Sequence, residues 1–172
     1  REGEIWLGTN EGLAVLFSPQ NIFEPELSYD ASILVIDEDG DGAGERVLGA
    51  QAIVDIAVDG SNKKWFATTG SGVFYTSETG REQLSRFTSS NSPLPTDRLI
   101  DIEVDGVTGM VYFGTEEGIV AFQGRATDGV DRMSDVYAYP NPVRPEYEGP
   151  ILIRGLVTNA QVKITDAAGN LV

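Results

Sequence analysis

The sequence contains no cysteine and no histidine among its 172 residues. These absences exclude thiol nucleophiles, imidazole bases and the two commonest zinc ligands. Carboxylates, Ser, Lys and Tyr remain as candidates for catalysis. The lack of cysteine leaves the redox compartment open, because cytosolic and exported proteins can both fold without disulfides.

Basic residues are also scarce. The chain has 12 Lys and Arg against 27 Asp and Glu, a formal charge of −15. Such a surface repels nucleic-acid backbones and anionic lipid headgroups, so we expect neither as a partner. No apolar run approaches the roughly 20 residues that a membrane-spanning helix needs. The chain opens on Arg1 without a signal-like apolar stretch, which indicates an internal or processed piece of a longer protein.

Helical periodicity is nearly missing as well. Short runs rich in β-branched and aromatic residues follow one another instead, separated by Gly, Asn, Asp, Ser and Pro. Apolar residues make up 41% of the chain, which is enough for a real core. We therefore predict an all-β fold.

One sequence motif, here called the repeated phrase, occurs three times. It reads WLGTNEG from Trp6, WFATTGSG from Trp65 and YFGTEEG from Tyr112. Residues 52–74 align with residues 98–120 as strand, Asp-Gly turn, strand, Gly turn and strand. The spacing is close to the ~40–50 residues of a four-stranded propeller blade. These repeats predict a partial β-propeller of about two to three four-stranded blades, because a blade needs neighbours to bury its faces.

The repeated residue types suggest structural roles. Apolar residues in the run IVDIAV, with Ile56 and Val58 set against Val54, are typical of a strand packed on both faces. The rings at positions 6, 65 and 112 are expected to fill the space between stacked sheets. We expect tight turns at the two Asp-Gly pairs and a positive φ at three glycines, at Asp59-Gly60, Asp105-Gly106, Gly12, Gly72 and Gly118.

The sequence pattern changes after Arg125. We expect propeller blades over residues 1–126, a linker with a proline-rich elbow over 127–150, and the start of a β-sandwich over 151–172. Four prolines within VYAYPNPVRPEYEGP exclude a helix or a central strand there. Alternating apolar residues predict strands in ILIR and VKITD, and DAAGN predicts a turn toward a third strand, so the sandwich is truncated.

The most specific chemical motif is DEDGDG, which places Asp37, Asp39 and Asp41 at positions 1, 3 and 5 of a calcium loop. Glu45 falls at position nine and could add a ligand. Position 12 is Leu48, so the usual bidentate carboxylate is missing. The alternative is an acidic hairpin tip, in which Asp and Gly serve only as turn residues. Calcium is the one cofactor that the sequence suggests.

Other candidates have stronger structural explanations. Paired carboxylates such as Glu116 and Glu117, or Asp55 and Asp101, could be a glycosidase acid and nucleophile. Asp55 and Asp101 occupy equivalent repeat positions, however, and a repeat position normally serves the repeat. The three repeated rings could line a sugar-binding surface, but a position between blades is the simpler interpretation.

These phrases carry a family resemblance. EIWLGTNEGL, VDGSNKKWFATTGSGVF and MVYFGTEEGIVAF resemble the blade repeat of the two-component regulator propeller family, over roughly residues 4 to 126. The second copy departs from the repeat at Ala67, where glycine is preferred. YPNPVRP, ILIRGL and VKITDAAGNLV resemble the C-terminal signal domain of proteins exported by the type IX secretion system. Together the two halves are similar to the propeller accessory proteins of that system.

The resemblance implies a non-enzymatic scaffold at the cell surface or in the periplasm of a Gram-negative bacterium. Its implied partners are other secretion proteins, such as the sortase that attaches cargo to anionic lipopolysaccharide, and lipopolysaccharide or another glycan. One alternative is the periplasmic ligand-sensing propeller of a hybrid two-component system. A second is a polysaccharide-active enzyme. We also expect the chain by itself to self-associate, because too few blades leave inter-blade faces uncovered.

Overall fold

The computed structural model describes residues 3–24, 26–27, 30–36, 44–130, 133, 136–158, 160–166 and 168–171. In this part the chain forms short antiparallel strands, and its helical structure is limited to the 3-10 helix η1 (Pro19–Phe23). No helix among the described residues is long and apolar enough to cross a membrane. The expected all-β fold is confirmed.

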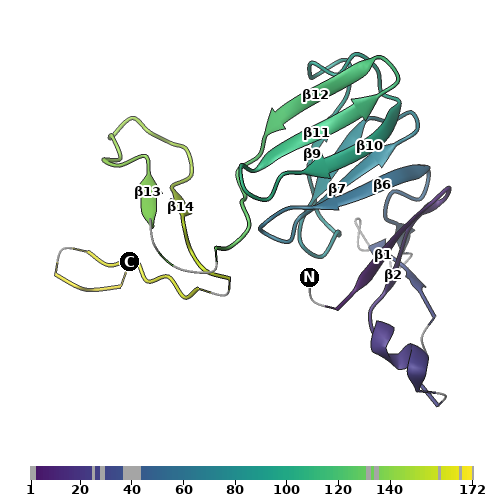
Figure 1. The fold of residues 1–172 in the computed structure, drawn as a ribbon, viewed down its shortest axis with the longest axis horizontal. Coiled ribbons are helices and arrows are strands. Elements are labelled where there is room, and N and C mark those ends of the chain that lie inside the picture. Colours follow the sequence, from purple (N-terminus) through teal and green to yellow (C-terminus); the bar gives the residue numbers. More distant parts are fainter. Residues whose placement is uncertain are drawn as a thin grey trace.

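Three sheets follow one another along the chain (Figure 1). The first sheet contains β1 (Ile5–Thr9), β2 (Gly12–Leu16) and β3 (Ser32–Ile33), in that order. The second contains β6 (Ile53–Val58), β7 (Lys64–Thr68), β8 (Val73–Thr76) and β9 (Gln83–Phe87). The third contains β10 (Leu99–Val104), β11 (Met110–Thr115) and β12 (Gly118–Gln123). These meandering sheets are the blades of a partial propeller.

Two shorter pairs complete the described strands. They are β4 (Val35–Ile36) with β5 (Glu45–Arg46), and β13 (Tyr137–Tyr139) with β14 (Leu152–Arg154). Strand β13 lies within the range expected to be a linker. In VKITD, Val162 and Ile164 are exposed and lie outside the named strands. Of the strands predicted in VKITD and after it, the described residues form a single isolated antiparallel bridge, between Thr165 and Leu171. The predicted turn after it forms, with the Asp166 N–H donating to the Asn170 carbonyl at 2.9 Å.

Two apolar clusters hold the sheets together. One lies between the second and third sheets and contains Trp65, which is 2% exposed, with Val73, Ile102, Val111 and Phe113. The other lies between the first and second sheets and is built around Leu13, Phe66 and Phe74. The second sheet lies between the two clusters and thus buries side chains on both faces of its middle strand, β7.

The threonine of the repeated phrase explains why that phrase recurs. The Thr9 hydroxyl donates to the Gly12 carbonyl at 2.9 Å and accepts from the Glu11 N–H at 3.0 Å. The hydroxyls of Thr68 and Thr115 make the same pair of bonds in the other two copies. The three predicted glycines have positive φ, at 100° for Gly12, 78° for Gly72 and 138° for Gly118. Threonine and glycine together therefore close the same hairpin in each blade.

The Asp-Gly turns are built differently from a two-residue hairpin. The Asp59 N–H donates to the Lys63 carbonyl at 3.0 Å, so the first turn is longer, and the positive φ falls on Asn62 at 63°. The Asp59 carboxylate organises it by accepting the N–H of Ser61 at 2.9 Å. Glycine at position 60 is instead required by space, because a Cβ there would overlap the Thr127 carbonyl.

A β-bulge changes the expected pattern at the start of β6 and of β10. The register shifts between Ile53 and Asp55, and again between Leu99 and Asp101. The residue inside each bulge is turned outward, so Val54 is 42% exposed. The assignment of Val54 to a packed face is therefore wrong, because an extra residue in one strand reverses the alternation.

Candidate functional site

The acidic motif is only partly within the described residues. Asp37, Asp39 and Asp41 lie outside them, so their predicted calcium site remains a prediction. Glu45 is described and lies in β5, where it is exposed and paired with Ile36 of β4. The pairing of β4 with β5 therefore flanks the motif with two strands, as expected for the acidic tip, whereas a calcium loop of this spacing usually lies between helices.

The carboxylates of Asp55 and Asp101 lie together where the second sheet meets the third. Asp55 Oδ2 accepts the N–H of Ile102 at 2.9 Å, across the blade boundary, and its Oδ1 accepts the N–H of Ile56 at 2.8 Å. A side-chain hydrogen bond with Asp55, together with repulsion between the two carboxylates, raises the pKa of Asp101. These bonds support a structural role for the pair, in which Asp55 joins neighbouring blades.

The other paired carboxylates, Glu116 and Glu117, are exposed in the hairpin between β11 and β12. The Glu117 N–H donates to the Thr115 hydroxyl at 3.2 Å as part of the repeated turn.

The three repeated rings have different surroundings. Trp65 is buried and stacks on Tyr75 with ring centroids 4.0 Å apart. Trp6 packs on Phe66 at 6.2 Å. Tyr112 occupies the equivalent position on the third sheet but is 40% exposed, because no other sheet among the described residues covers it. The inter-blade interpretation holds for both tryptophans, and Tyr112 departs from it in this chain.

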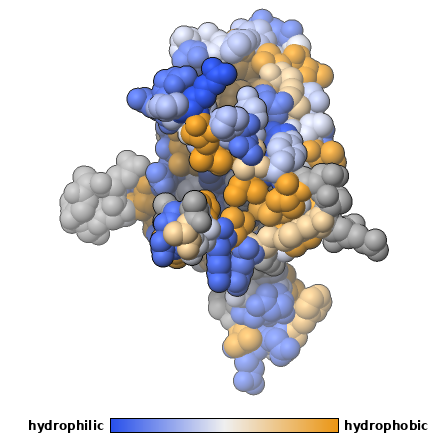
Figure 2. Space-filling view, turned by 90° about the vertical axis from the view of Figure 1, so that its left-hand side faces the viewer, coloured by the Kyte–Doolittle hydropathy of each residue, from blue (hydrophilic) through white to orange (hydrophobic). Residues whose placement is uncertain are grey.

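A cleft of about 1180 Å³ lies between the blades and a wall that includes residues 152–158. Its blade wall is formed by the Asp59–Lys63 turn, the aromatic ends of the second and third sheets and the segment from Gly124 to Gly129. Its other wall is β14 and the residues that follow. Figure 2 shows apolar residues between hydrophilic ones on the side that carries this C-terminal segment.

The segment between the two walls is anchored to both. The Asp128 N–H donates to the Gly106 carbonyl at 2.6 Å, and the Val130 N–H donates to the Leu156 carbonyl at 3.0 Å. Glycine at positions 60 and 106 allows this approach, because a Cβ at either one would overlap Thr127 or Asp128. The segment predicted to begin a linker therefore packs against both Asp-Gly turns. The sequence spacing of the two Asp-Gly turns does not predict that both contact residues 127–128.

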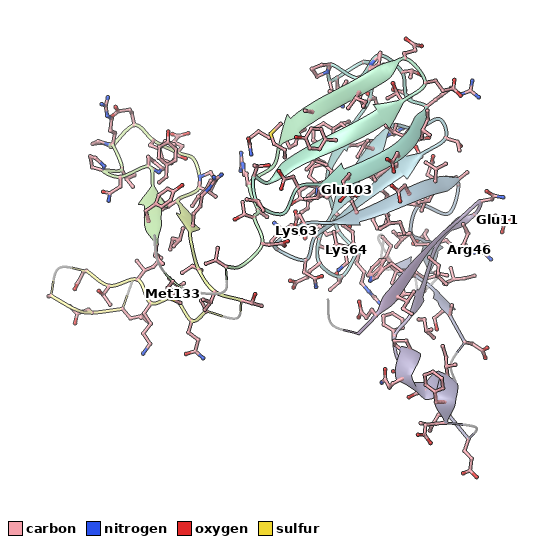
Figure 3. All side chains as sticks on the ribbon, in the orientation of Figure 1. Glu11, Arg46, Lys63, Lys64, Glu103 and Met133 are labelled. Atoms are coloured by element: carbon pink, nitrogen blue, oxygen red, sulfur yellow. The ribbon has the colours of Figure 1, made fainter. Side chains whose placement is uncertain are left out.

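Three cationic side chains line the cleft, although the chain is strongly acidic. They are Lys63, Arg125 and Arg154. Lys63 lies at the end of the second sheet nearest the C-terminal strands, with its Nζ 5.9 Å from the Tyr75 ring centroid (Figure 3). These three residues were not predicted from the sequence, because they lie far apart along the chain. Since the chain has only 12 Lys and Arg, each basic residue could have been considered as a candidate binding residue.

A phenol at the cleft wall is held in its neutral form. The Tyr75 hydroxyl donates to Asp59 Oδ2 at 2.9 Å, and Asp59 is only 4% exposed. Burial, followed by the nearby Asp59 charge, raises the pKa of Tyr75 well above its ordinary value. Tyr75 is therefore neutral at pH 7, with its O–H committed to Asp59, and is not available there as a base.

No protein-family model matches the chain, and a search of curated proteins finds no match. Among solved structures, PorZ of Porphyromonas gingivalis is similar, with 33% sequence identity, a TM-score of 0.68 and coverage of 99% of this chain. PorZ is described as an essential surface component of the type IX secretion system. The chain spans 23% of the length of PorZ.

Two structures of the extracellular domain of BT4673 from B. thetaiotaomicron also match. Their identities are 17% and 16%, both with a TM-score of 0.37. They cover 69% and 80% of this chain, which corresponds to 20% and 22% of the matched chains. The similarity to PorZ confirms the resemblance expected for the propeller repeats. The resemblance of the C-terminal part to a signal domain stays a prediction.

Proposed function

We propose that the chain is a non-catalytic binding and scaffold segment of an exported accessory protein of type IX secretion. The similarity to PorZ, at 33% identity across 99% of the chain, is the observation that carries this proposal. The protein would act at the cell surface or in the periplasm, and its partners would be other secretion-system proteins, such as the surface sortase, and lipopolysaccharide or another glycan.

The residue chemistry agrees with binding rather than turnover. The chain has no histidine or cysteine. Asp55 and Asp101 are the carboxylate pair that most resembles a catalytic pair. Asp55 already accepts hydrogen bonds from the N–H groups of Ile56 and Ile102. The cleft instead offers aromatic rings and cationic groups, which suit an anionic or polyhydroxylated group of a partner.

Deletion of the gene for the full-length protein tests this role in a bacterium that carries it. We expect secreted cargo to lose its surface attachment while the sortase remains intact. Complementation with Pro140, Pro142 and Pro145 replaced by Gly should restore attachment only in part, because these residues lie outside the strands and stiffen the connection between β13 and β14. Complementation with Glu117→Gln, an exposed change in a blade hairpin, is the control and should restore it fully.

Two results would replace the proposal. Hydrolysis of a polysaccharide by the purified full-length protein, abolished by changing one carboxylate, would show an enzyme. A deletion phenotype limited to transcription in response to a glycan would show a sensor instead.

A further inference from the structure

Positive charge without a counter-charge gathers in the cleft between the blades and the C-terminal strands. Lys63, Arg125 and Arg154 all line this cleft, and none of them forms an ion pair with a described residue. They come from the turn between β6 and β7, the segment after β12 and strand β14. In a chain of charge −15, three such cations in one cleft favour an anionic ligand.

Two carboxylates lie beside the cleft without neutralising these cations. Asp59 Oδ1 accepts the N–H of Lys63 at 3.1 Å, and its Oδ2 accepts the Tyr75 hydroxyl at 2.9 Å. The Asp128 carboxylate lies against Gly106. Among the described residues, neither carboxylate forms an ion pair with a cation of the cleft. The cationic side chains are therefore available to the carboxylates of a ligand.

Much of the remaining lining is aliphatic. On the blade wall, Leu84 of β9 is 37% exposed and Phe122 of β12 is 36% exposed. On the opposite wall, Leu152, Leu156 and Val157 are half-buried. Sugar hydroxyls would lose hydrogen bonds against such side chains, whereas an apolar side chain gains from the contact. The lining thus favours an anion that also carries apolar groups.

The cleft lies within the chain and not at an end of the row of blades. Its lining residues run from Gly60 to Ala160 along the sequence. The Val130 N–H donates to the Leu156 carbonyl at 3.0 Å, which joins the segment after the blades to the opposite wall. Figure 1 shows the C-terminal end of the chain beyond β14, on the side away from the blades. The chain itself therefore forms both walls of the site.

We propose that this cleft binds an acidic peptide segment of a partner protein, with its carboxylates at Lys63, Arg125 and Arg154 and its apolar side chains against Leu84 and Phe122. Cations on three separate segments match several carboxylates along one peptide, which a single fatty acid does not provide. The aliphatic lining favours a peptide over a polysaccharide. The inference rests on the proposed scaffold role, because it assigns a protein partner of that role to one surface.

Fluorescence anisotropy of the purified full-length protein tests the cleft, with a short labelled peptide of alternating Asp and Leu as the probe. We expect binding in the micromolar range that weakens as salt rises. Arg125→Gln and Arg154→Gln should each weaken binding about tenfold, because each removes a charged hydrogen-bond donor to a carboxylate. Leu84→Ser should weaken binding as well, since it removes an apolar contact.

Arg98→Gln is the matched control, since Arg98 is exposed and lies outside the cleft, and it should bind like wild type. A peptide of alternating Asn and Leu should not bind. Melting curves verify that each variant is folded, and Lys63→Gln replaces an arginine variant that is not.

No binding of the acidic peptide would overturn the inference, and this would also be the result if a later part of the full-length protein filled the cleft. Folded arginine variants that bind like wild type would overturn it too. Tighter binding of polygalacturonate than of the peptide, lost in the same variants, would assign the cleft to an anionic glycan instead. Peptide binding and cargo attachment are measured separately, so the cleft assignment can fail while the scaffold role stands, and the reverse.

Discussion

At the scale of single residues, carboxylates serve as connectors. Asp59 and Asp105 organise the turn after the first strand of their blades, and Asp55 bonds to the backbone of the next blade. Asp105 accepts the Thr108 hydroxyl at 2.5 Å, which lowers its pKa. These three aspartates therefore have a local structural role in addition to their charge.

Asp55→Ala should lower the free energy of unfolding by roughly 1–3 kcal/mol, because it leaves the N–H of the buried Ile102 without an acceptor. Urea unfolding measures this loss. Asp55→Asn is the control, since its amide oxygen retains one acceptor and should recover part of the stability. Equal losses for both variants would contradict the hydrogen-bonding role.

Asp101→Asn should change how stability depends on pH. Because the folded pKa of Asp101 is raised, its contribution is fully present below the unfolded pKa of about 4 and is lost as pH rises through the folded pKa. The variant lacks this loss, so its stability relative to wild type should increase from pH 3.5 to 7. Urea unfolding across that range measures the difference, and a pH-independent difference would show that the pair is not coupled.

At the scale of elements, the hairpins and turns determine how blades meet other segments. The Thr and Gly of each repeated phrase close a hairpin, whereas Gly60 and Gly106 provide room for Thr127 and Asp128. The Asp-Gly turns therefore connect the blades to the segment that leads to the C-terminal strands.

Gly60→Ala should destabilise the chain by roughly 1–3 kcal/mol, because the added methyl group overlaps the Thr127 backbone. Gly70→Ala is the matched control, since a Cβ there meets nothing within 4 Å. Thermal unfolding of both variants measures the difference. Equal melting temperatures would show that residues 127–128 do not hold this position in solution.

The hairpin of β4 and β5 has its own test. If Asp37, Asp39 and Asp41 bind calcium, a chelator should lower the melting temperature, because a ligand stabilises only the state that binds it. Asp39→Ala should remove that difference, and Glu116→Gln, an exposed change in the hairpin between β11 and β12, should retain it. Identical melting curves of the wild type in calcium and in chelator would establish a plain acidic turn.

At the scale of the whole molecule, stability depends on contacts between neighbouring blades. Trp65 contributes most visibly, with Tyr75 on one side and the rings of Phe87, Phe113 and Phe122 around it. The same dependence leaves both ends of the row exposed. Blade number, and not only blade sequence, therefore determines how much apolar surface remains uncovered.

Trp65→Ala should destabilise the chain by roughly 3–5 kcal/mol, because it opens a cavity between two blades. Trp6→Ala removes a similar ring from a half-buried position and should cost less. Denaturant unfolding followed by circular dichroism compares the two. A larger loss for Trp6→Ala would show that the first contact, rather than the second, holds the blades together.

The sequence by itself determined the strands and hairpins, because a strand with period two and a turn residue such as Gly72 are local features. It also identified the equivalence of Trp6, Trp65 and Tyr112. Only the tertiary structure decided that Trp65 is buried and Tyr112 exposed, since burial depends on whether another sheet packs against that face. The bulge at Val54 and the cleft cations were likewise beyond sequence reasoning, because register and long-range proximity arise only when sheets and segments pack together.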